Sequence, residues 1–127
     1  DIYMPDLKSL DPAFTATALS APDYPAVAAA ALDEMVRQVG PVDCGPDGIL
    51  RRGVLVRHLV MPGRGADSRR VLEHLAARFG GDVAVNVMGQ YHPCGRAGEH
   101  EGLGIALPRE EWDAAAAVAE ALGLRPA

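Results

Sequence analysis

The sequence predicts an α/β fold built on a parallel sheet, and three observations support this. Apolar runs with the character of strands, at residues 2–8, 53–61 and 83–88, alternate with segments of helical periodicity. The middle run is apolar on both faces apart from Arg57 and His58, as expected for a strand buried on both sides of a parallel sheet. Helical segments separate successive strands, and this order favours right-handed parallel crossovers.

The length of the chain argues for part of a larger domain. Three core strands are few for a complete α/β domain, and a full eightfold β/α barrel needs about 250 residues, whereas this chain has 127. The chain also begins at Asp1 inside an apolar, strand-like run, without an initiator methionine. We therefore expect residues 1–127 to form a single α/β half-barrel fragment whose other half lies upstream.

The composition indicates a folded protein and argues against several partners. Hydrophobic residues make up 49% and charged residues 23% of the chain, a normal globular mixture. The net charge is -5 and the arginines are scattered, so there is no basic patch for nucleic acid or an anionic membrane. No apolar run reaches the roughly 18 residues of a membrane span. We expect a soluble, cytoplasmic protein that binds neither nucleic acid nor membrane.

The first strand and the first two helices are predicted from local signals. The apolar run from Ile2 turns polar at its end, which indicates a buried strand with a charged carboxyl end. Asp11 followed by proline predicts a helix through about Leu19. A second, amphipathic helix is expected from Tyr24 to Val39, where Gly and Pro end it. Its apolar residues at helical spacing are Val27, Ala30, Ala31, Met35 and Val36.

The remaining elements follow from turn and capping residues. Gly45–Gly48 is rich in turn formers and predicts a small hairpin. After the strand at 53–61, Asp67 or Ser68 is expected to cap a helix that ends near Phe79. The strand at 83–88 leads into a polar loop at 89–104, and a last, alanine-rich helix is expected over 108–122.

The candidate site residues lie where parallel α/β proteins place their active sites, beyond the carboxyl ends of the strands. Period-two alternation puts Asp6 and Lys8, the only lysine, on one face of the first strand. Such a pair can hold a zwitterion, with the carboxylate accepting from an amine or a ribose hydroxyl and the ammonium binding a carboxylate. The alternative is a structural ion pair at the end of the strand.

Arg57 and His58 are expected on opposite faces of the middle strand. A buried arginine must be paired, and Asp6 is the candidate partner if the two strands are neighbours. For His58 the favoured interpretation is a hydrogen-bonded core histidine.

The polar loop admits several interpretations. His92, Cys94 and His100 are close in sequence, but their spacing matches no zinc signature, and proline between His92 and Cys94 argues against a nucleophile and its base. We expect a polar loop or one that closes over a small ligand. Cys44 and Cys94 are too far apart for a disulfide framework or a clustered metal site.

Three motifs, in order and in spacing, resemble a known family. They are Asp1 to Lys8 (DIYMPDLK), Val56 to Gly63 (VRHLVMPG) and Asn86 to His92 (NVMGQYH). Together they resemble the later half of radical S-adenosylmethionine enzymes of the pyruvate formate-lyase activating-enzyme type. The similarity spans nearly the whole chain.

The resemblance implies a fold, cofactors and site residues. The fold is the carboxyl-terminal half of a partial, TIM-type (β/α)₆ barrel. The cofactors of the full-length protein are S-adenosylmethionine and a [4Fe-4S] cluster, which generate a 5′-deoxyadenosyl radical for a protein substrate such as a glycyl-radical enzyme. By motif position, Asp6, Lys8, Arg57 and His92 would bind S-adenosylmethionine, with His92 near its adenine. No catalytic residue and no metal ligand is assigned within the chain.

One family feature is absent, because the chain lacks the Cys-x3-Cys-x2-Cys loop that ligates the cluster. We expect that loop upstream of Asp1, so the fragment alone should hold no cluster and catalyse nothing. The alternative function is a non-enzymatic α/β interaction module that self-associates through its sheet edges. A hydrolase using His92 and Cys94 is a third, weaker hypothesis.

Overall fold

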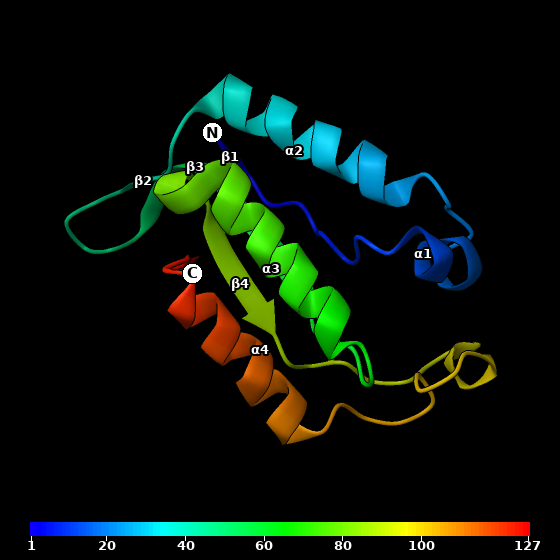
Figure 1. Cartoon of the computed structure of the whole chain (residues 1–127). Coiled ribbons are helices and arrows are strands. Elements are labelled where there is room, and N and C mark those ends of the chain that lie inside the picture. Colours follow the sequence, from blue (N-terminus) through cyan, green and yellow to red (C-terminus); the bar gives the residue numbers. More distant parts are fainter.

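The computed structural model describes residues 1–127, in which a sheet is lined by helices along one of its faces (Figure 1). The helices are α1 (Pro12–Ala18), α2 (Tyr24–Val39), α3 (Gly65–Phe79) and α4 (Arg109–Ala121). The strands are β1 (Ile2–Tyr3), β2 (Asp43–Cys44), β3 (Leu50–Leu59), β4 (Ala84–Met88) and β5 (Arg125–Pro126). Short 3₁₀ turns, η1 (Gly80–Asp82) and η2 (Ala97–Glu99), complete the chain.

The sheet confirms the predicted parallel α/β fold. Its order is β1-β3-β4-β5, and every neighbouring pair along this path is parallel. The short β2 pairs antiparallel with the start of β3 and forms the predicted hairpin, which projects from the body in Figure 1. The sheet is open, with β1 and β5 as its edges, so these residues do not close a barrel.

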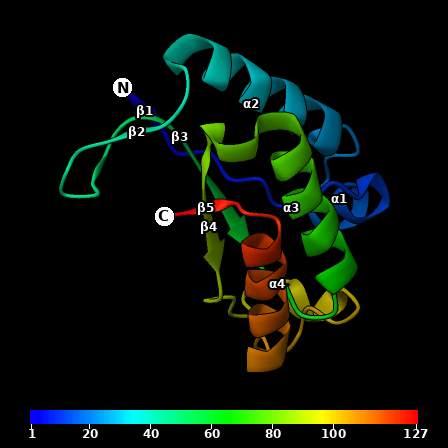
Figure 2. The ribbon, with the colours of Figure 1, turned by 60° about the vertical axis from the view of Figure 1, so that its left-hand side comes forward.

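Helices cover only one face of the sheet. In Figure 2 the strands lie on one side and α2, α3 and α4 on the other. Along β3, Val54, Val56 and His58 are buried beneath the helices, whereas the alternating residues Leu55 and Arg57 are only half-buried. The expectation that this strand is buried on both faces was therefore wrong. Its apolar sequence reflects one face packed under helices and one apolar face without a cover.

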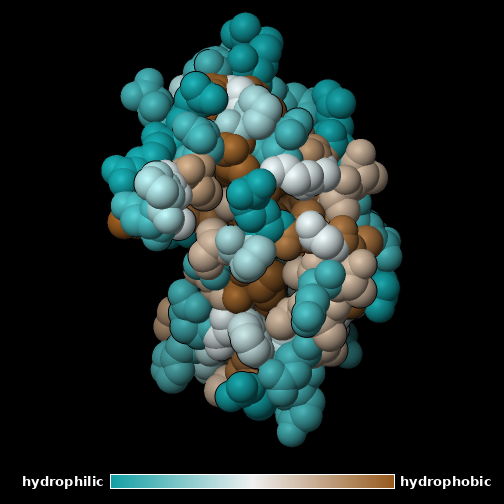
Figure 3. Space-filling model, turned by 90° about the vertical axis from the view of Figure 1, so that its left-hand side faces the viewer, coloured by the Kyte–Doolittle hydropathy of each residue, from teal (hydrophilic) through white to brown (hydrophobic).

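The uncovered face carries exposed apolar side chains. Ile2 is 46% and Met4 is 56% exposed. Strand register places Leu55 and Leu59 of β3 on the same face as Ile2. From the side on which the hairpin and the chain ends lie in Figure 1, the molecule shows apolar surface in its middle, surrounded by hydrophilic groups (Figure 3).

The core lies between the sheet and the helix layer. It is formed by ten buried residues, which are Leu7, Leu32, Val54, Val56, Val71, Leu72, Leu75, Val83, Val85 and Leu124. The helix α2 has the predicted bounds, but only part of the predicted face is buried: Met35 and Val36 pack on the core, whereas Val27, Ala30 and Ala31 are exposed. Leu32 is 2% exposed and Val27 is 59% exposed. The row that includes Ala28, Leu32 and Met35 packs on the core, while Ala30 and Ala31 face outwards.

One further local prediction was wrong, and one strand was not predicted. Asp67 and Ser68 do not cap α3: the helix begins at Gly65, so both lie inside its first turn and are buried. The strand β5 was not predicted, because two residues carry no periodicity and its pairing with Ala84 and Val85 depends on tertiary contact.

The first and last helices agree with prediction, and Asp11 caps α1 through its side chain. No helix is long and apolar enough to cross a bilayer.

Candidate functional site

The segment after β1 continues beside β3 and carries two of the predicted site residues. The Arg57 N–H donates to the carbonyl of Pro5 at 2.8 Å, and the Leu7 N–H donates to the carbonyl of Arg57 at 2.9 Å. Asp6 therefore lies directly opposite Arg57, in a parallel bridge. Because proline has no N–H, the regular ladder of β1 stops early even though the chain keeps its extended course.

Asp6, Lys8 and Arg57 form one charged cluster on the uncovered face. Arg57 Nε donates to Asp6 Oδ1 at 2.7 Å, and Lys8 Nζ donates to Asp6 Oδ2 at 3.2 Å. The predicted pairing of Asp6 with Arg57 is thus confirmed. Burial acts to raise the pKa of the Asp6 carboxyl, but hydrogen bonds from Lys8 and Arg57 outweigh it and hold that pKa below its ordinary value.

The cluster has spare binding capacity. It contains two cations and one carboxylate, so it carries a net positive charge when all three groups are ionised. Arg57 uses only Nε within the protein, which leaves its terminal nitrogens free to donate. The side chains of Lys8 and Arg57 are 42% and 38% exposed. A ligand with an anionic group beside an amine or a hydroxyl would match this arrangement.

Strand register adds a residue that sequence reasoning missed. Asn86 of β4 is in register with Arg57 and shares its face of the sheet, and it makes no hydrogen bond through its side chain. Met88 is likewise in register with Leu59. Period-two alternation within 83–88 could have indicated which residues share a face, but only the register shows that Asn86 lies beside Arg57.

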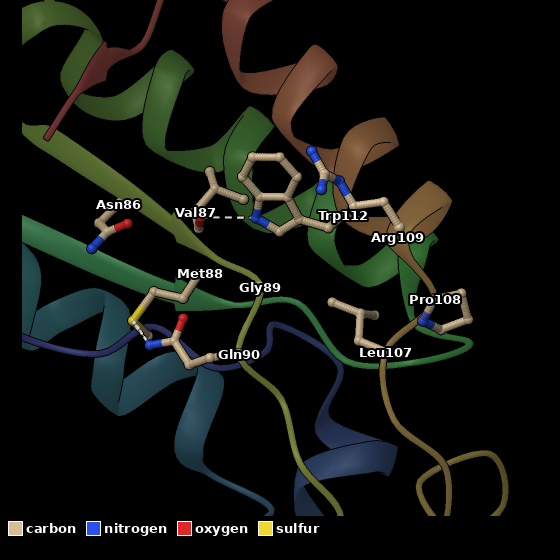
Figure 4. Close-up of a pocket in the computed structure, with 9 residues that line it drawn as sticks. All are labelled: Asn86, Val87, Met88, Gly89, Gln90, Leu107, Pro108, Arg109 and Trp112. Carbon is tan, nitrogen blue, oxygen red and sulfur yellow. Dashed lines mark hydrogen bonds between the residues drawn. The ribbon is translucent and has the colours of Figure 1, made fainter.

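A cleft of about 470 Å³ lies at the carboxyl end of β4, beside this row (Figure 4). Asn86, Met88 and Gln90 line it from the strand side, and Leu107, Pro108 and Trp112 line it from the start of α4. Trp112 Nε1 donates to the carbonyl of Val87 at 3.0 Å, which satisfies an acceptor beyond the end of β5.

The glycine at 89 is required for this packing. A Cβ there would lie 2.6 Å from Trp112 Cδ1, so a larger residue would displace the indole. Asp6, Lys8 and Arg57 line none of five cavities of about 300 to 540 Å³ in the structure. The charged cluster lies on open surface, and a ligand held there would need a second wall.

The fourth predicted site residue, His92, lies apart from the charged cluster. It is exposed in the loop after β4, and no hydrogen bond or ion pair joins it to Asp6, Lys8 or Arg57. It lines a separate cavity of about 300 Å³ with Phe14 of α1. The loop does leave the same end of the sheet as the cluster, because β3 and β4 are parallel.

The loop around His92 is held by Tyr91, whose hydroxyl donates to the carbonyl of Leu103 at 2.6 Å. Burial, together with the nearby Cys94 thiol, raises the pKa of Tyr91. Cys94 and His100 line the same cavity as His92, but no group of three or more His, Cys, Asp or Glu side chains is arranged to hold a metal ion. Cys44 and Cys94 are both free and exposed.

His58 is a hydrogen-bonded core histidine, as predicted. It is 1% exposed, and its ring nitrogens lie 2.8 Å from the carbonyl of Leu7 and 2.8 Å from Ser68 Oγ. Its face of β3 is the one beneath the helices, opposite to the face of Arg57.

Fold and site together define a parallel α/β protein with one helix-covered face and a charged cluster on the other. Comparisons with protein-family models, with curated proteins and with solved structures found no significant match.

Proposed function

We propose that the chain is the carboxyl-terminal portion of a radical S-adenosylmethionine enzyme of the pyruvate formate-lyase activating type. One observation carries the proposal: Asp6, Lys8 and Arg57, named by the motifs, form one cluster at the carboxyl ends of neighbouring parallel strands. Ligands of parallel α/β folds bind at that end of the sheet.

The donor set suits the methionine part of S-adenosylmethionine, which presents an ammonium group and a carboxylate on one carbon. The Asp6 carboxylate accepts from the ammonium group, while Lys8 and Arg57 donate to the carboxylate. His92, from the loop at the same end of the sheet, is assigned to the adenine side. When bound, S-adenosylmethionine supplies the 5′-deoxyadenosyl group from which the radical forms.

The residues present do not suit an iron–sulfur cluster. Cys44 pairs at the start of β3, and Cys94 follows the carboxyl end of β4, so the two thiols lie at opposite ends of the sheet. Thiol ligands of a cluster must converge on one point. No step through the cluster is therefore assigned to this chain, and the proposal places the cluster ligands in an upstream half-barrel.

The face of the sheet that no helix covers supports the proposal of an upstream half-barrel that completes the site. In a barrel, the face without helices is the interior, and it would be covered by the other strands. An upstream half-barrel joined at the free edge of β1 would cover Ile2 and Met4 and provide the missing wall of the site. The open reading frame of the full-length protein tests this directly: the three-cysteine loop should precede Asp1 by about one half-domain.

Binding measurements on the full-length protein test the site. Asp6→Ala and Lys8→Ala should each weaken S-adenosylmethionine binding, measured by isothermal titration calorimetry, and leave the circular dichroism spectrum unchanged. Asp113→Ala is the matched control, because Asp113 forms a similar exposed ion pair with Arg109 on α4. Unchanged affinity in both site variants would make the Asp6–Lys8 pair a structural ion pair only.

The second candidate function is a self-associating interaction module. The observation that favours it is the uncovered face, where Ile2 and Met4 are exposed beside the free edge of β1. Light scattering after size exclusion should then give a dimer that Met4→Lys dissociates. Val27→Lys, at an exposed position on α2, should leave the dimer intact. A monomer at all concentrations would exclude this function.

A further inference from the structure

The buried polar side chains of the core gather at one place. Five buried side chains are polar or charged, and these are Ser9, Thr15, His58, Asp67 and Ser68. Four of them, all except Thr15, hydrogen-bond to each other or to the backbone between Leu7 and Asp11. That backbone begins immediately behind the charged cluster. Buried polar groups destabilise a core unless they are satisfied, so their concentration here calls for an explanation.

His58 is the centre of this arrangement. A carbonyl can only accept, so the ring nitrogen Nδ1, 2.8 Å from the Leu7 carbonyl, must carry the proton in the neutral ring. Nε2 is then the acceptor, and the Ser68 hydroxyl donates to it at 2.8 Å. The bond from His58 ends on Leu7, the residue between Asp6 and Lys8. We call residues 6–11 the arm. Through these two hydrogen bonds, the imidazole of His58 on β3 connects the backbone of the arm to the first turn of α3.

Asp67 holds the next residues along the arm. It accepts from the Ser9 hydroxyl and from the Leu10 N–H, the latter at 3.1 Å. Arg64 donates to the same carboxylate at 3.1 Å and balances its charge. Ser9 Oγ in turn accepts from the Asp11 N–H at 3.0 Å, just before α1 begins.

Tyr24 of α2 fixes the arm from its other side. Its hydroxyl accepts from the Lys8 N–H at 2.9 Å and donates to the Asp6 carbonyl at 3.2 Å. The backbone groups around both charged residues are thus held by side chains of β3, α2 and α3. Asp6 and Lys8 have their charged ends on the open face while their backbone is anchored in the core.

We propose that His58, supported by Ser68, is a positioning residue that sets the placement of Asp6 and Lys8 for ligand binding. The inference deepens the proposed function, on which its ligand-binding part rests. His58 does not touch the ligand; it acts through the Leu7 carbonyl. An apolar residue of similar size would fill the same space under α3 without directing the arm.

Three variants test the role. His58→Leu keeps the volume and removes both hydrogen bonds, and His58→Asn restores a donor near Nδ1. Leu75→Ala destabilises the same core and leaves both hydrogen bonds of His58 in place. In the full-length protein, His58→Leu should weaken S-adenosylmethionine binding by on the order of tenfold, and His58→Asn should recover most of it. Leu75→Ala should lower the melting temperature and leave the affinity unchanged.

A second readout does not depend on the ligand. Carboxyl ¹³C NMR of the 127-residue chain reports the Asp6 pKa, which Lys8 and Arg57 hold low. His58→Leu should raise that pKa towards 3.8, and Leu75→Ala should not. If His58→Leu fails to fold, Ser68→Ala takes its place. An unchanged Asp6 pKa in the folded variant would overturn the positioning role. If wild type binds no S-adenosylmethionine, the proposed function fails while the NMR result still decides the role of His58.

Discussion

At the scale of single residues, the candidate site depends on Asp6. This carboxylate accepts from both Arg57 and Lys8 and is the only anion in the cluster. Its side chain is 30% exposed, so solvent screens the pairs and each contributes about 1 kcal/mol or less to stability. The pairs therefore contribute little to folding, and the binding role proposed for the cluster depends on the Asp6→Ala and Lys8→Ala measurements.

The burial of His58 predicts that the free energy of unfolding depends on pH. Burial lowers the pKa of this histidine below 6.5, so the unfolded chain takes up a proton at a higher pH than the folded chain does. The contribution of His58 to the free energy of unfolding should be constant above about pH 7 and should fall as the pH drops below 6.5, by at most about 1.4 kcal/mol per pH unit. Urea denaturation between pH 7.5 and 5.5 measures this slope.

His58→Gln is the comparison for that slope, since it removes the titrating group and should flatten the curve. Val27→Gln, at an exposed position without a titrating group, should leave the slope as in wild type. A slope unchanged by His58→Gln would show that another group is responsible.

At the scale of elements, the first turn of α3 is unusual because Asp67 within it serves a neighbouring segment instead of its own helix. The helix has no side-chain cap, and Asp67 bonds to Ser9 and Leu10. Sequence signals for caps assume that a carboxylate near a helix start serves that helix. Here the Asp67 carboxylate instead accepts hydrogen bonds from Ser9 and Leu10 of the arm, and α3 has no side-chain cap.

Replacing Asp67 should therefore be costly. Asp67→Ala leaves the buried Ser9 hydroxyl and the Leu10 N–H without their acceptor and leaves Arg64 paired with Asp11 alone. This should lower the free energy of unfolding by about 3 kcal/mol. The control on the same helix is Glu73→Ala, whose exposed pair with Arg69 should contribute less than about 0.5 kcal/mol. Chemical denaturation of both variants gives the comparison, and equal losses would contradict the role of Asp67.

The buried face of α2 gives a second prediction at this scale. Leu32→Ala should lower the free energy of unfolding by about 3 kcal/mol, because it removes a fully packed core side chain. Val27→Ala should change it by less than about 0.5 kcal/mol, since Val27 faces solvent. Thermal or urea unfolding distinguishes the two, and the reverse order would place Val27 on the buried face, as the sequence pattern predicted.

At the scale of the whole molecule, the distribution of helices decides what the sheet can do. The helices α2, α3 and α4 lie on one side of it, and the charged cluster lies on the other (Figure 2). The cluster therefore adjoins apolar surface that is free for a further wall, whether an upstream half-barrel or a second copy of the chain.

The positions of the two cysteines predict that this chain does not hold an iron–sulfur cluster. Anaerobic treatment of the 127-residue chain with iron and sulfide should yield no stable, stoichiometric cluster, because Cys44 and Cys94 lie at opposite ends of the sheet. After desalting, we expect the protein-bound iron and sulfide to be as low as in a Cys44→Ser, Cys94→Ser double variant. A cluster retained by wild type and lost in the double variant would contradict it.

Much of the fold could be predicted from local sequence. Asp11 before proline, the bounds of α2, the turn formers of the hairpin and the alternation of strands with helices all indicated the observed elements. Alternation also placed Asp6 with Lys8 and separated Arg57 from His58. These features depend on backbone dihedral preferences and side-chain periodicity, which act over a few residues.

What the tertiary structure decided depends on contacts between distant segments. Whether β3 is covered on one face or two, which row of α2 is buried, and where β5 pairs are set by packing. The register between β3 and β4 brought Asn86 beside Arg57, and the fold kept His92 apart from the cluster. Local patterns specify which residues share a face, but only packing specifies what lies against that face.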